Sequence, residues 1–180
     1  MRTKEEILRL GGESIKSEDY DVLDSTARSI KAKRILEIGS RWGASSMLFA
    51  EICKENGGQL ICIEPEPTPE WYENMKQYNG TVKLIKTYSP WVRIEDIPQE
   101  LDYLFIDGDH RTRFAICDYH FFSPFVRAGG LIAFHDTNVI DMGVDRALKI
   151  ILEESNNNLE LIGEAKGECG TKVFKKTELF

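Results

Sequence analysis

The chain has 180 residues, of which 42% are hydrophobic and 29% are charged, and its formal net charge at pH 7 is −7. This length and composition indicate one globular domain with one core and exclude an intrinsically disordered chain. The acidic balance argues against nucleic acid as the main partner, because phosphate backbones are bound by basic surfaces. No apolar run approaches the roughly 20 residues that a membrane-spanning helix needs, so no membrane partner is expected.

The cysteines and the N-terminal segment are typical of a cytoplasmic protein. Residues 1–10 carry charges throughout, unlike the apolar core of a secretory signal peptide. The four cysteines are widely spaced and include no C-x-x-C pair: Cys53, Cys62, Cys117 and Cys169. Both features predict reduced thiols and a cytoplasmic protein.

Short apolar runs alternate with helical patterns along most of the chain. Strands are predicted at 34–39, 59–64, 81–86, 101–107 and 130–136. Helices are predicted within 17–32 and over 43–56, 68–78, 111–127 and 141–155. This alternation is typical of βαβ units, which build a parallel sheet.

The C-terminal part has a different pattern. The apolar runs 159–162 and 171–175 flank a glycine-rich stretch that is too short for a helix, which predicts an antiparallel hairpin. The predicted fold class is therefore α/β, with a Rossmann-like, doubly wound, mostly parallel sheet that ends in this hairpin. We expect one domain over 1–180, with 1–32 as an N-terminal helical segment.

Polar and charged residues gather where the predicted strands end. They are Glu37, Gly39, Glu64, Asp107, Asp109, His110, His135 and Asp136. Ligands of open α/β sheets bind beyond the carboxyl ends of the strands. The sequence therefore predicts the functional site at this edge of the sheet.

A glycine-containing loop joins the first strand to a helix in residues 35–46, ILEIGSRWGASS. Gly39 permits a tight turn, and Ser45 suits the start of a helix. The spacing to Gly43 lacks the middle glycine of the dinucleotide fingerprint G-x-G-x-x-G. The acid before the loop, Glu37, would repel a pyrophosphate but favour a cationic group. The loop thus favours S-adenosylmethionine over a nicotinamide cofactor, and an ordinary βα turn is the structural alternative.

Three motifs carry a family resemblance: LEIGSRWGAS at 36–45, IDGDH at 106–110 and GGLIAFHD at 129–136. With them the chain resembles the class I S-adenosylmethionine-dependent methyltransferases over about residues 20–176. The likeness is to a small bacterial group close to methyltransferase family 24. The cofactor-binding residues that we predict on this basis are Glu37, Gly39, Ser40, Gly43, Ser45, Glu64, Ser89 and Asp107.

The resemblance also implies the role of individual residues. Glu64, 25 residues after Gly39, matches the acid that holds the ribose hydroxyls, and Glu66 is the alternative if the register differs. A carboxylate can accept both hydroxyl bonds. Ser89 is expected beside the adenine, with Tyr88 as a further candidate.

The acids and histidines that end two neighbouring strands suggest a metal. Carboxylates brought so close would repel one another, and a divalent cation such as Mg²⁺ or Mn²⁺ would relieve the repulsion. Likeness to metal-dependent O-methyltransferases implies Asp107, His135 and Asp136 as ligands, with His135 standing where an aspartate is usual. A hydrogen-bonded cluster without metal is the alternative.

Asp109 and His110 are the candidate catalytic residues. Either could accept the proton of a substrate hydroxyl as general base, while positioning supplies much of the rate. The structural alternative is that His110 caps the following helix.

The predicted function is methyl transfer from S-adenosylmethionine to a hydroxyl of a small molecule or sugar, with or without a divalent metal. The alternatives are a nicotinamide-dependent oxidoreductase and a binding protein or metal-dependent hydrolase on the same sheet. The chain has little spare length to cover its substrate, apart from segment 137–146. We therefore expect either a large acceptor such as a glycan or a second subunit, as in a homo-oligomer, that closes the pocket.

Overall fold

The computed structural model describes residues 1–12, 14–156 and 158–178. Its helices are α1 (Lys4–Leu10), α2 (Ser17–Ser29), α3 (Ala44–Asn56), α4 (Pro69–Met75), α5 (Thr112–Phe122) and α6 (Val144–Glu154). Its strands are β1 (Arg34–Ile38), β2 (Gln59–Ile63), β3 (Val82–Ile85), β4 (Leu101–Ile106), β5 (Val126–Phe134), β6 (Leu159–Ala165) and β7 (Thr171–Lys176). Four short 3₁₀ turns are η1 (Lys76–Tyr78), η2 (Ser89–Trp91), η3 (Ile94–Asp96) and η4 (Ser123–Phe125).

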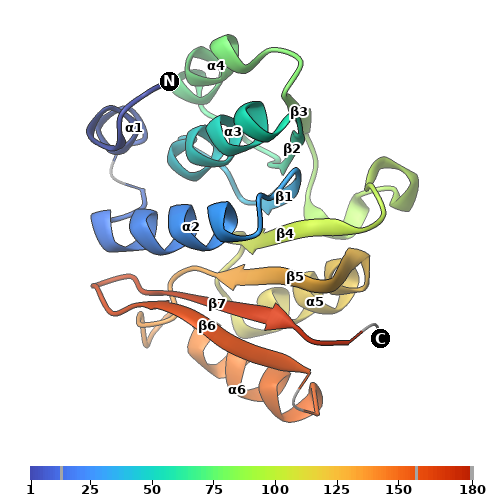
Figure 1. The fold of residues 1–180 in the computed structure, drawn as a ribbon. Coiled ribbons are helices and arrows are strands. Elements are labelled where there is room, and N and C mark those ends of the chain that lie inside the picture. The colour runs from blue at the N-terminus through green and yellow to red at the C-terminus, as the bar shows by residue number, and fades with distance from the viewer. Residues whose placement is uncertain (13, 157, 179–180) are drawn as a thin grey trace.

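The strands form one sheet in the order β3-β2-β1-β4-β5-β7-β6 (Figure 1). Strands β1 to β5 pair in parallel, and β7 pairs antiparallel with both β5 and β6. The predicted mostly parallel sheet with a C-terminal hairpin is confirmed. The hairpin adds two strands beside β5 without a helical crossover, as its short glycine-rich connection requires.

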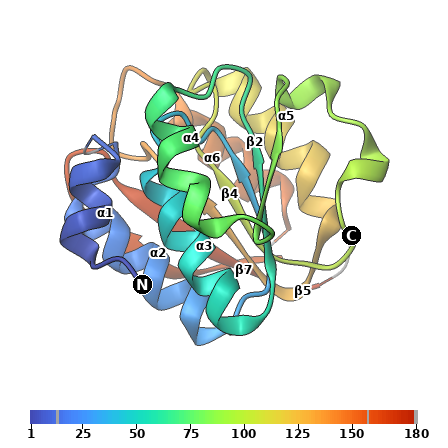
Figure 2. The same ribbon diagram turned by 90° about the horizontal axis from the view of Figure 1, so that it is seen from above.

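Helices cover both faces of the sheet. Figure 2 shows α1, α2 and α3 gathered on one side of the strands and α5 on the other. Successive residues of a strand point to opposite faces, so Ile35 joins a core cluster with α2 and α3, while Leu36 joins a cluster with α5 and α6. This two-sided burial explains why the central strands are continuous apolar runs in the sequence.

Helices α5 and α1 differ from the sequence predictions. Helix α5 stops at Phe122, because Pro124 lies in a 3₁₀ turn and strand β5 begins at Val126, four residues before the strand predicted at 130–136. Helix α1 lies in the predicted helical segment 1–32 but before the helix predicted within 17–32; it has seven residues and starts with a capping box between Thr3 and Glu6. Among the described residues, no helix has the length and apolar character needed to cross a membrane.

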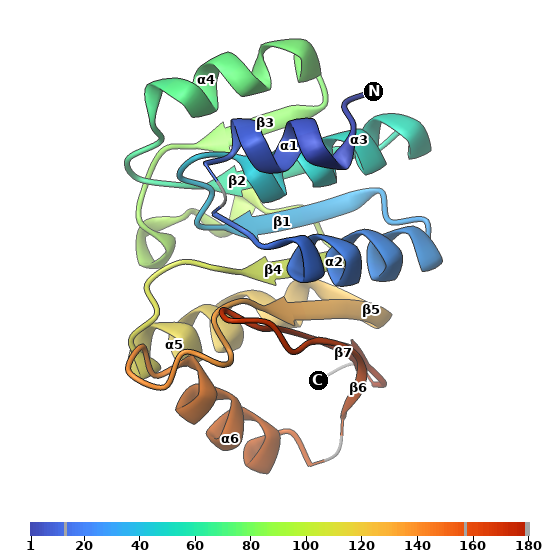
Figure 3. The same cartoon turned by 90° about the vertical axis from the view of Figure 1, so that its left-hand side faces the viewer.

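The order of the strands places the ligand-binding edge. After β1 the chain builds β2 and β3 on one side, then returns to β4 on the other side of β1. The arrowheads of β1, β4 and β5 point to the same edge in Figure 3. The loop after β1 leads to α3 on one face of the sheet and the loop after β4 leads to α5 on the other, which makes this edge the topological switch point at which open α/β sheets bind ligands.

Candidate functional site

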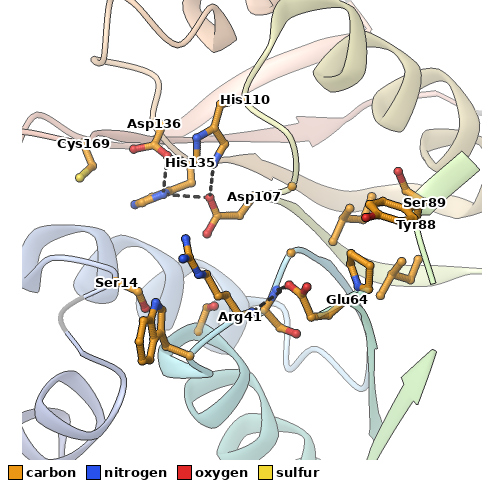
Figure 4. A pocket seen from close by; sticks show the side chains of 18 residues that line it. Ser14, Arg41, Glu64, Tyr88, Ser89, Asp107, His110, His135, Asp136 and Cys169 are labelled. Atoms are coloured by element: carbon orange, nitrogen blue, oxygen red, sulfur yellow. Dashed lines mark hydrogen bonds and ion pairs between the residues drawn. The ribbon is translucent and has the colours of Figure 1, made fainter. Parts of the chain in front are cut away.

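A pocket of about 450 Å³ lies at this switch point (Figure 4). It has two ends: Glu64 and Ser89 lie at one, and His135 and Cys169 lie at the other. Its lining residues are Ser14, Ile38, Gly39, Ser40, Arg41, Trp42, Ser45, Ile63, Glu64, Pro65, Tyr88, Ser89, Asp107, Gly108, His110, His135, Asp136 and Cys169.

Gly39 allows the loops after β1 and β4 to touch. Its φ is +81°, and a Cβ at this position would lie 2.0 Å from the carbonyl oxygen of Asp107. No other residue fits this approach. The second loop glycine, Gly43, begins α3 at φ +88° and packs near Trp71 outside the pocket lining.

Glu37 lies fully buried behind the loop and does not line the pocket. Its carboxylate accepts bonds from the hydroxyls of Ser45 and Ser46 and from the Cys62 thiol at 3.2 Å. Burial raises the pKa of Glu37 to about 7, although these three donors oppose the shift. Glu37 thus anchors the start of α3 through Ser45 and Ser46. The direct contact of Glu37 with a cofactor stays a prediction.

Glu64 and Ser40 offer polar groups to a ligand. Glu64 Oε2 accepts the backbone N–H groups of Ser40 and Arg41 at 3.0 Å, which fixes the carboxylate against the loop. The alternative acid, Glu66, is exposed and donates its backbone N–H to Glu64 Oε1 at 2.8 Å. Within the described residues the buried Ser40 Oγ has no hydrogen-bond partner. A buried polar atom without a partner is costly, so this hydroxyl is suited to meet a ligand.

Ser89 and Tyr88 line the same end of the pocket. Both lie in or beside the 3₁₀ turn η2, where Tyr88 is half exposed and its ring packs edge-on against Trp91. Asp118 of α5 is buried nearby, and burial raises its pKa to about 6 while Ser89 opposes the shift. The structure thus brings the predicted adenine neighbours Ser89 and Tyr88 together with an acid that sequence reasoning missed.

The opposite end holds the predicted cluster of acids and histidines. His135 Nδ1 lies 3.1 Å from Asp107 Oδ1 and 3.4 Å from Asp136 Oδ2. His110 Nε2 lies 3.2 Å from Asp136 Oδ2 and 3.5 Å from Asp107 Oδ1. Asp136 also has a φ of +55°, a strained value for a residue with a side chain, and such strain concentrates at functional sites.

The charges of this cluster stabilise one another. Burial alone would raise the pKa of Asp107, but His135 and His110 outweigh it and hold that pKa below its usual value. Burial alone would lower the pKa of His135, but the carboxylates of Asp107, Asp136 and Asp19 raise it well above the usual range. A hydrogen bond to Asp107 likewise raises the pKa of His110. Asp107 is therefore ionised, and positive charge on His135 balances it.

The two candidate bases lie in different environments. Asp109 is paired with Arg111 at 2.8 Å, does not line the pocket, and has a pKa that this arginine lowers. His110 lines the pocket, and its Nδ1 lies 3.0 Å from Met142 Sδ. The geometry favours His110 as the residue that meets a substrate.

A divalent metal would fit part of the cluster. Asp107, His110 and Asp136 offer ligand atoms that all lie within 4.8 Å of one another. Two carboxylates and an imidazole suit Mn²⁺ and, less well, Mg²⁺. His110 is then the third metal ligand, in place of the predicted His135. His135 instead contacts the carboxylates of Asp107 and Asp136.

Sequence reasoning missed several residues around the pocket. Arg41 follows Gly39 and points its side chain toward Asp107 (Figure 4). Ser14 and Cys169 come from segments far from the motifs, and Asp19 of α2 lies beneath His135. Asp19 is an acidic residue in an ordinary amphipathic helix. Nothing in the sequence around it indicates that it would lie at the pocket.

The sequence model of a family described as "Methyltransferase domain" matches residues 36–137. The match covers more than half of the chain and includes the glycine loop, the β4 acids and the β5 histidine. The chain belongs to this methyltransferase family.

Solved structures agree with this methyltransferase in fold. A putative O-methyltransferase from Klebsiella pneumoniae is 20% identical, with a TM-score of 0.75 over 97% of this chain and 89% of that chain. An O-methyltransferase from Bacillus cereus in complex with SAH is also 20% identical, with a TM-score of 0.75 over 96% and 90%. A putative caffeoyl-CoA O-methyltransferase from Staphylococcus aureus is 19% identical, with a TM-score of 0.77 over 97% and 93%.

An uncharacterized protein of Acanthamoeba polyphaga mimivirus is 29% identical over 130 residues, which are 65% of this chain. The matched part spans 58% of that relative's length. The chain therefore spans less than two thirds of the length of this relative.

Proposed function

We propose that this methyltransferase uses S-adenosylmethionine to methylate a hydroxyl group of a small molecule or sugar. The cofactor takes the end of the pocket between the glycine loop and Glu64, and the acceptor takes the end at His110. The B. cereus protein of the same fold is described in complex with SAH, which is the demethylated form of this cofactor.

The observation that carries the proposal is the pairing of Glu64 with Ser40 at the switch point. Backbone N–H groups of Ser40, Arg41 and Glu66 hold the Glu64 carboxylate at the pocket wall, beside the unpartnered hydroxyl of Ser40. Oxygens of a fixed carboxylate are suited to accept the two hydroxyls of a ribose. The neighbouring loop, made possible by Gly39, brings backbone N–H groups to the same place.

When bound, S-adenosylmethionine supplies a methyl group that is already activated by its sulfonium. Glu64 and the glycine loop hold the nucleoside, so that the methyl group faces the cluster at the other end of the pocket. His110 in its neutral form, with Nε2 held beside Asp107 and Asp136, accepts the proton of the acceptor hydroxyl at Nδ1 as the oxygen forms its bond to the methyl carbon and the carbon–sulfur electron pair returns to sulfur. Asp107 and Asp136 hold His110 in place for this transfer.

We also propose that a divalent metal assists the reaction in the presence of Mg²⁺ or Mn²⁺. Asp107, His110 and Asp136 would hold it through two carboxylates and an imidazole, and it would supply a lower pKa for the acceptor hydroxyl. With His110 bound to the metal, Asp109, which is paired with Arg111, is the remaining candidate proton acceptor.

The open side of the pocket indicates the size of the methyl acceptor. His110 is about one-third exposed, and Ile140 and Met142 of the neighbouring segment are exposed apolar side chains. This surface fits a large acceptor such as a glycan, or a second copy of the chain that closes the pocket. The four free cysteines support a reducing compartment such as the cytoplasm.

Calorimetric titration with S-adenosylmethionine and SAH tests the proposal, with NADH as the control ligand. We expect binding of the first two and about 10- to 100-fold weaker binding by Glu64→Gln, because a hydrogen bond to a charged group contributes about 1.5–3 kcal/mol. Glu66→Gln is the matched control and should bind like the unchanged protein. Binding of NADH alone would contradict the proposal and favour an oxidoreductase.

A further inference from the structure

The far side of His135 forms a second group of metal-ligating atoms, separate from Asp107, His110 and Asp136. Asp19, His135 and Cys169 offer a carboxylate oxygen, an imidazole nitrogen and a thiol sulfur within 4.8 Å of one another. They come from α2, the end of β5 and the β6–β7 hairpin. Figure 4 shows Cys169 beside the His135 ring, on the side away from Asp107.

His135 Nε2 is the atom that points to a ligand. The ring is only 3% exposed, and among the described residues Nε2 has no partner in hydrogen-bond geometry. The oxygen Oδ2 of Asp19 lies 3.5 Å from it. Three carboxylates surround this ring, those of Asp19, Asp107 and Asp136. They favour positive charge at the ring, which a metal on Nε2 would supply in place of the imidazolium proton, through a bond that this nitrogen otherwise lacks.

Each ligand is held by a second residue. Asp107 contacts the other ring nitrogen of His135 at 3.1 Å, which is the usual arrangement of a carboxylate behind a metal-bound histidine. Thr171 donates its hydroxyl to Asp19 Oδ1 at 2.8 Å, and Oδ2, which accepts the backbone N–H of Lys16 at 3.1 Å, lies toward the ring.

Asn138 fixes the hairpin at Cys169 and at Gly167. Its backbone N–H donates to the Cys169 carbonyl and its side-chain amide donates to Gly167, both at 2.9 Å. The thiol is therefore presented by a fixed loop and not by a free chain end.

We propose that Asp19, His135 and Cys169 bind a zinc ion that clamps α2 and the β6–β7 hairpin onto the methyltransferase pocket. Thiolate and imidazole ligands favour Zn²⁺ over Mg²⁺ and Ca²⁺, which prefer oxygen. Zinc–ligand bonds of about 2.0–2.3 Å need the three atoms to close in by on the order of 1 Å. Zinc takes four ligands in a tetrahedral site, and these residues supply three. Because His135 and Cys169 line the pocket, the fourth ligand position would face it.

Cobalt titration of the reduced, metal-free protein tests this site without any methyl acceptor. Co²⁺ bound to a thiolate gives a sulfur-to-cobalt charge-transfer band in the near ultraviolet. We expect one Co²⁺ per chain with this band, displaced by Zn²⁺. Cys169→Ser should abolish the band, whereas Cys117→Ser, which changes an exposed cysteine of α5 on the other face of the sheet, should keep it.

Thr171→Val tests the orientation of Asp19. The substitution keeps the side-chain volume but removes the hydroxyl bond, and loss of such a supporting bond weakens metal binding about 10-fold. Circular dichroism of each metal-free variant separates a lost ligand from a lost fold. The proposal is overturned if the reduced protein binds no Co²⁺, if the band survives Cys169→Ser, or if tight binding depends on His110 and not on Cys169.

Discussion

Gly39 is the residue whose backbone decides whether the pocket forms. We expect Gly39→Ala to lower the free energy of unfolding by on the order of 3–4 kcal/mol, because a methyl group there meets the Asp107 carbonyl in addition to an unfavourable φ. Gly80→Ala is the matched control, since Gly80 has a φ of +86° but open space around it, and should cost only about 1–2 kcal/mol. Equal losses in urea denaturation would show that the contact is relieved by a loop shift.

Glu37, behind the same loop, makes the free energy of unfolding depend on pH. Its pKa is about 7 in the folded protein and near its ordinary value of about 4.3 when unfolded, so the protonated form favours folding. That contribution is fully present below about pH 4 and is lost as the pH rises through 7.

Glu37→Gln removes this titration. The unfolding free energy of the unchanged protein, relative to Glu37→Gln, should fall by about 3 kcal/mol between pH 4 and pH 8. Urea denaturation of both proteins across this range measures the difference. A difference that does not vary with pH would mean that Ser45, Ser46 and Cys62 keep Glu37 ionised throughout.

At the scale of the elements, Asp102 of β4 connects three strands at the edge opposite the pocket. It accepts the backbone N–H groups of Lys33 and Arg34 before and in β1, both at 2.9 Å, and Arg127 Nε of β5 at 2.8 Å. Burial alone would raise the pKa of Asp102, but these donors outweigh it and lower the pKa. The ionised carboxylate therefore stabilises the fold above its unfolded pKa.

Asp102→Asn should lower the unfolding free energy by about 2 kcal/mol at pH 7, because bonds to a charged group are lost. The loss should shrink as the pH falls through the lowered pKa of Asp102. Glu100→Gln is the control, since the Glu100–Arg34 pair spans 3.5 Å with Glu100 72% exposed and should contribute under about 0.5 kcal/mol. Similar losses in both variants at pH 7 would contradict the role of Asp102.

For the whole molecule, cofactor binding should appear as thermal stabilisation. SAH at 100 times its dissociation constant adds about 2.7 kcal/mol to the folded state. In a protein of this size that raises the Tm by roughly 5–10 °C. Differential scanning fluorimetry measures the shift, and NADH should give none. A protein that NADH stabilises and SAH does not would contradict the assigned cofactor.

The sequence by itself determined the architecture of this protein. Buried runs such as 34–39 and 101–107 show strand length and two-sided burial directly, and the connection before 171–175 leaves no room for a crossover helix. The site was also predictable to the extent that it lies on motifs, since Glu64 and His110 follow strand ends. The wrong end of α5 came from apolar residues around Pro124 that suit a helix and a buried turn equally.

Only the tertiary structure decided which side chains meet. Glu37 and Glu64 both stand at the ends of predicted strands, yet Glu37 is turned inward to two serines and Glu64 faces the pocket. Asp19 and Cys169 lie 150 residues apart and meet at His135 only because α2 and the last hairpin pack on the same part of the sheet. Local patterns carry the period of a helix or strand, whereas such contacts depend on packing between distant segments, which no local pattern contains.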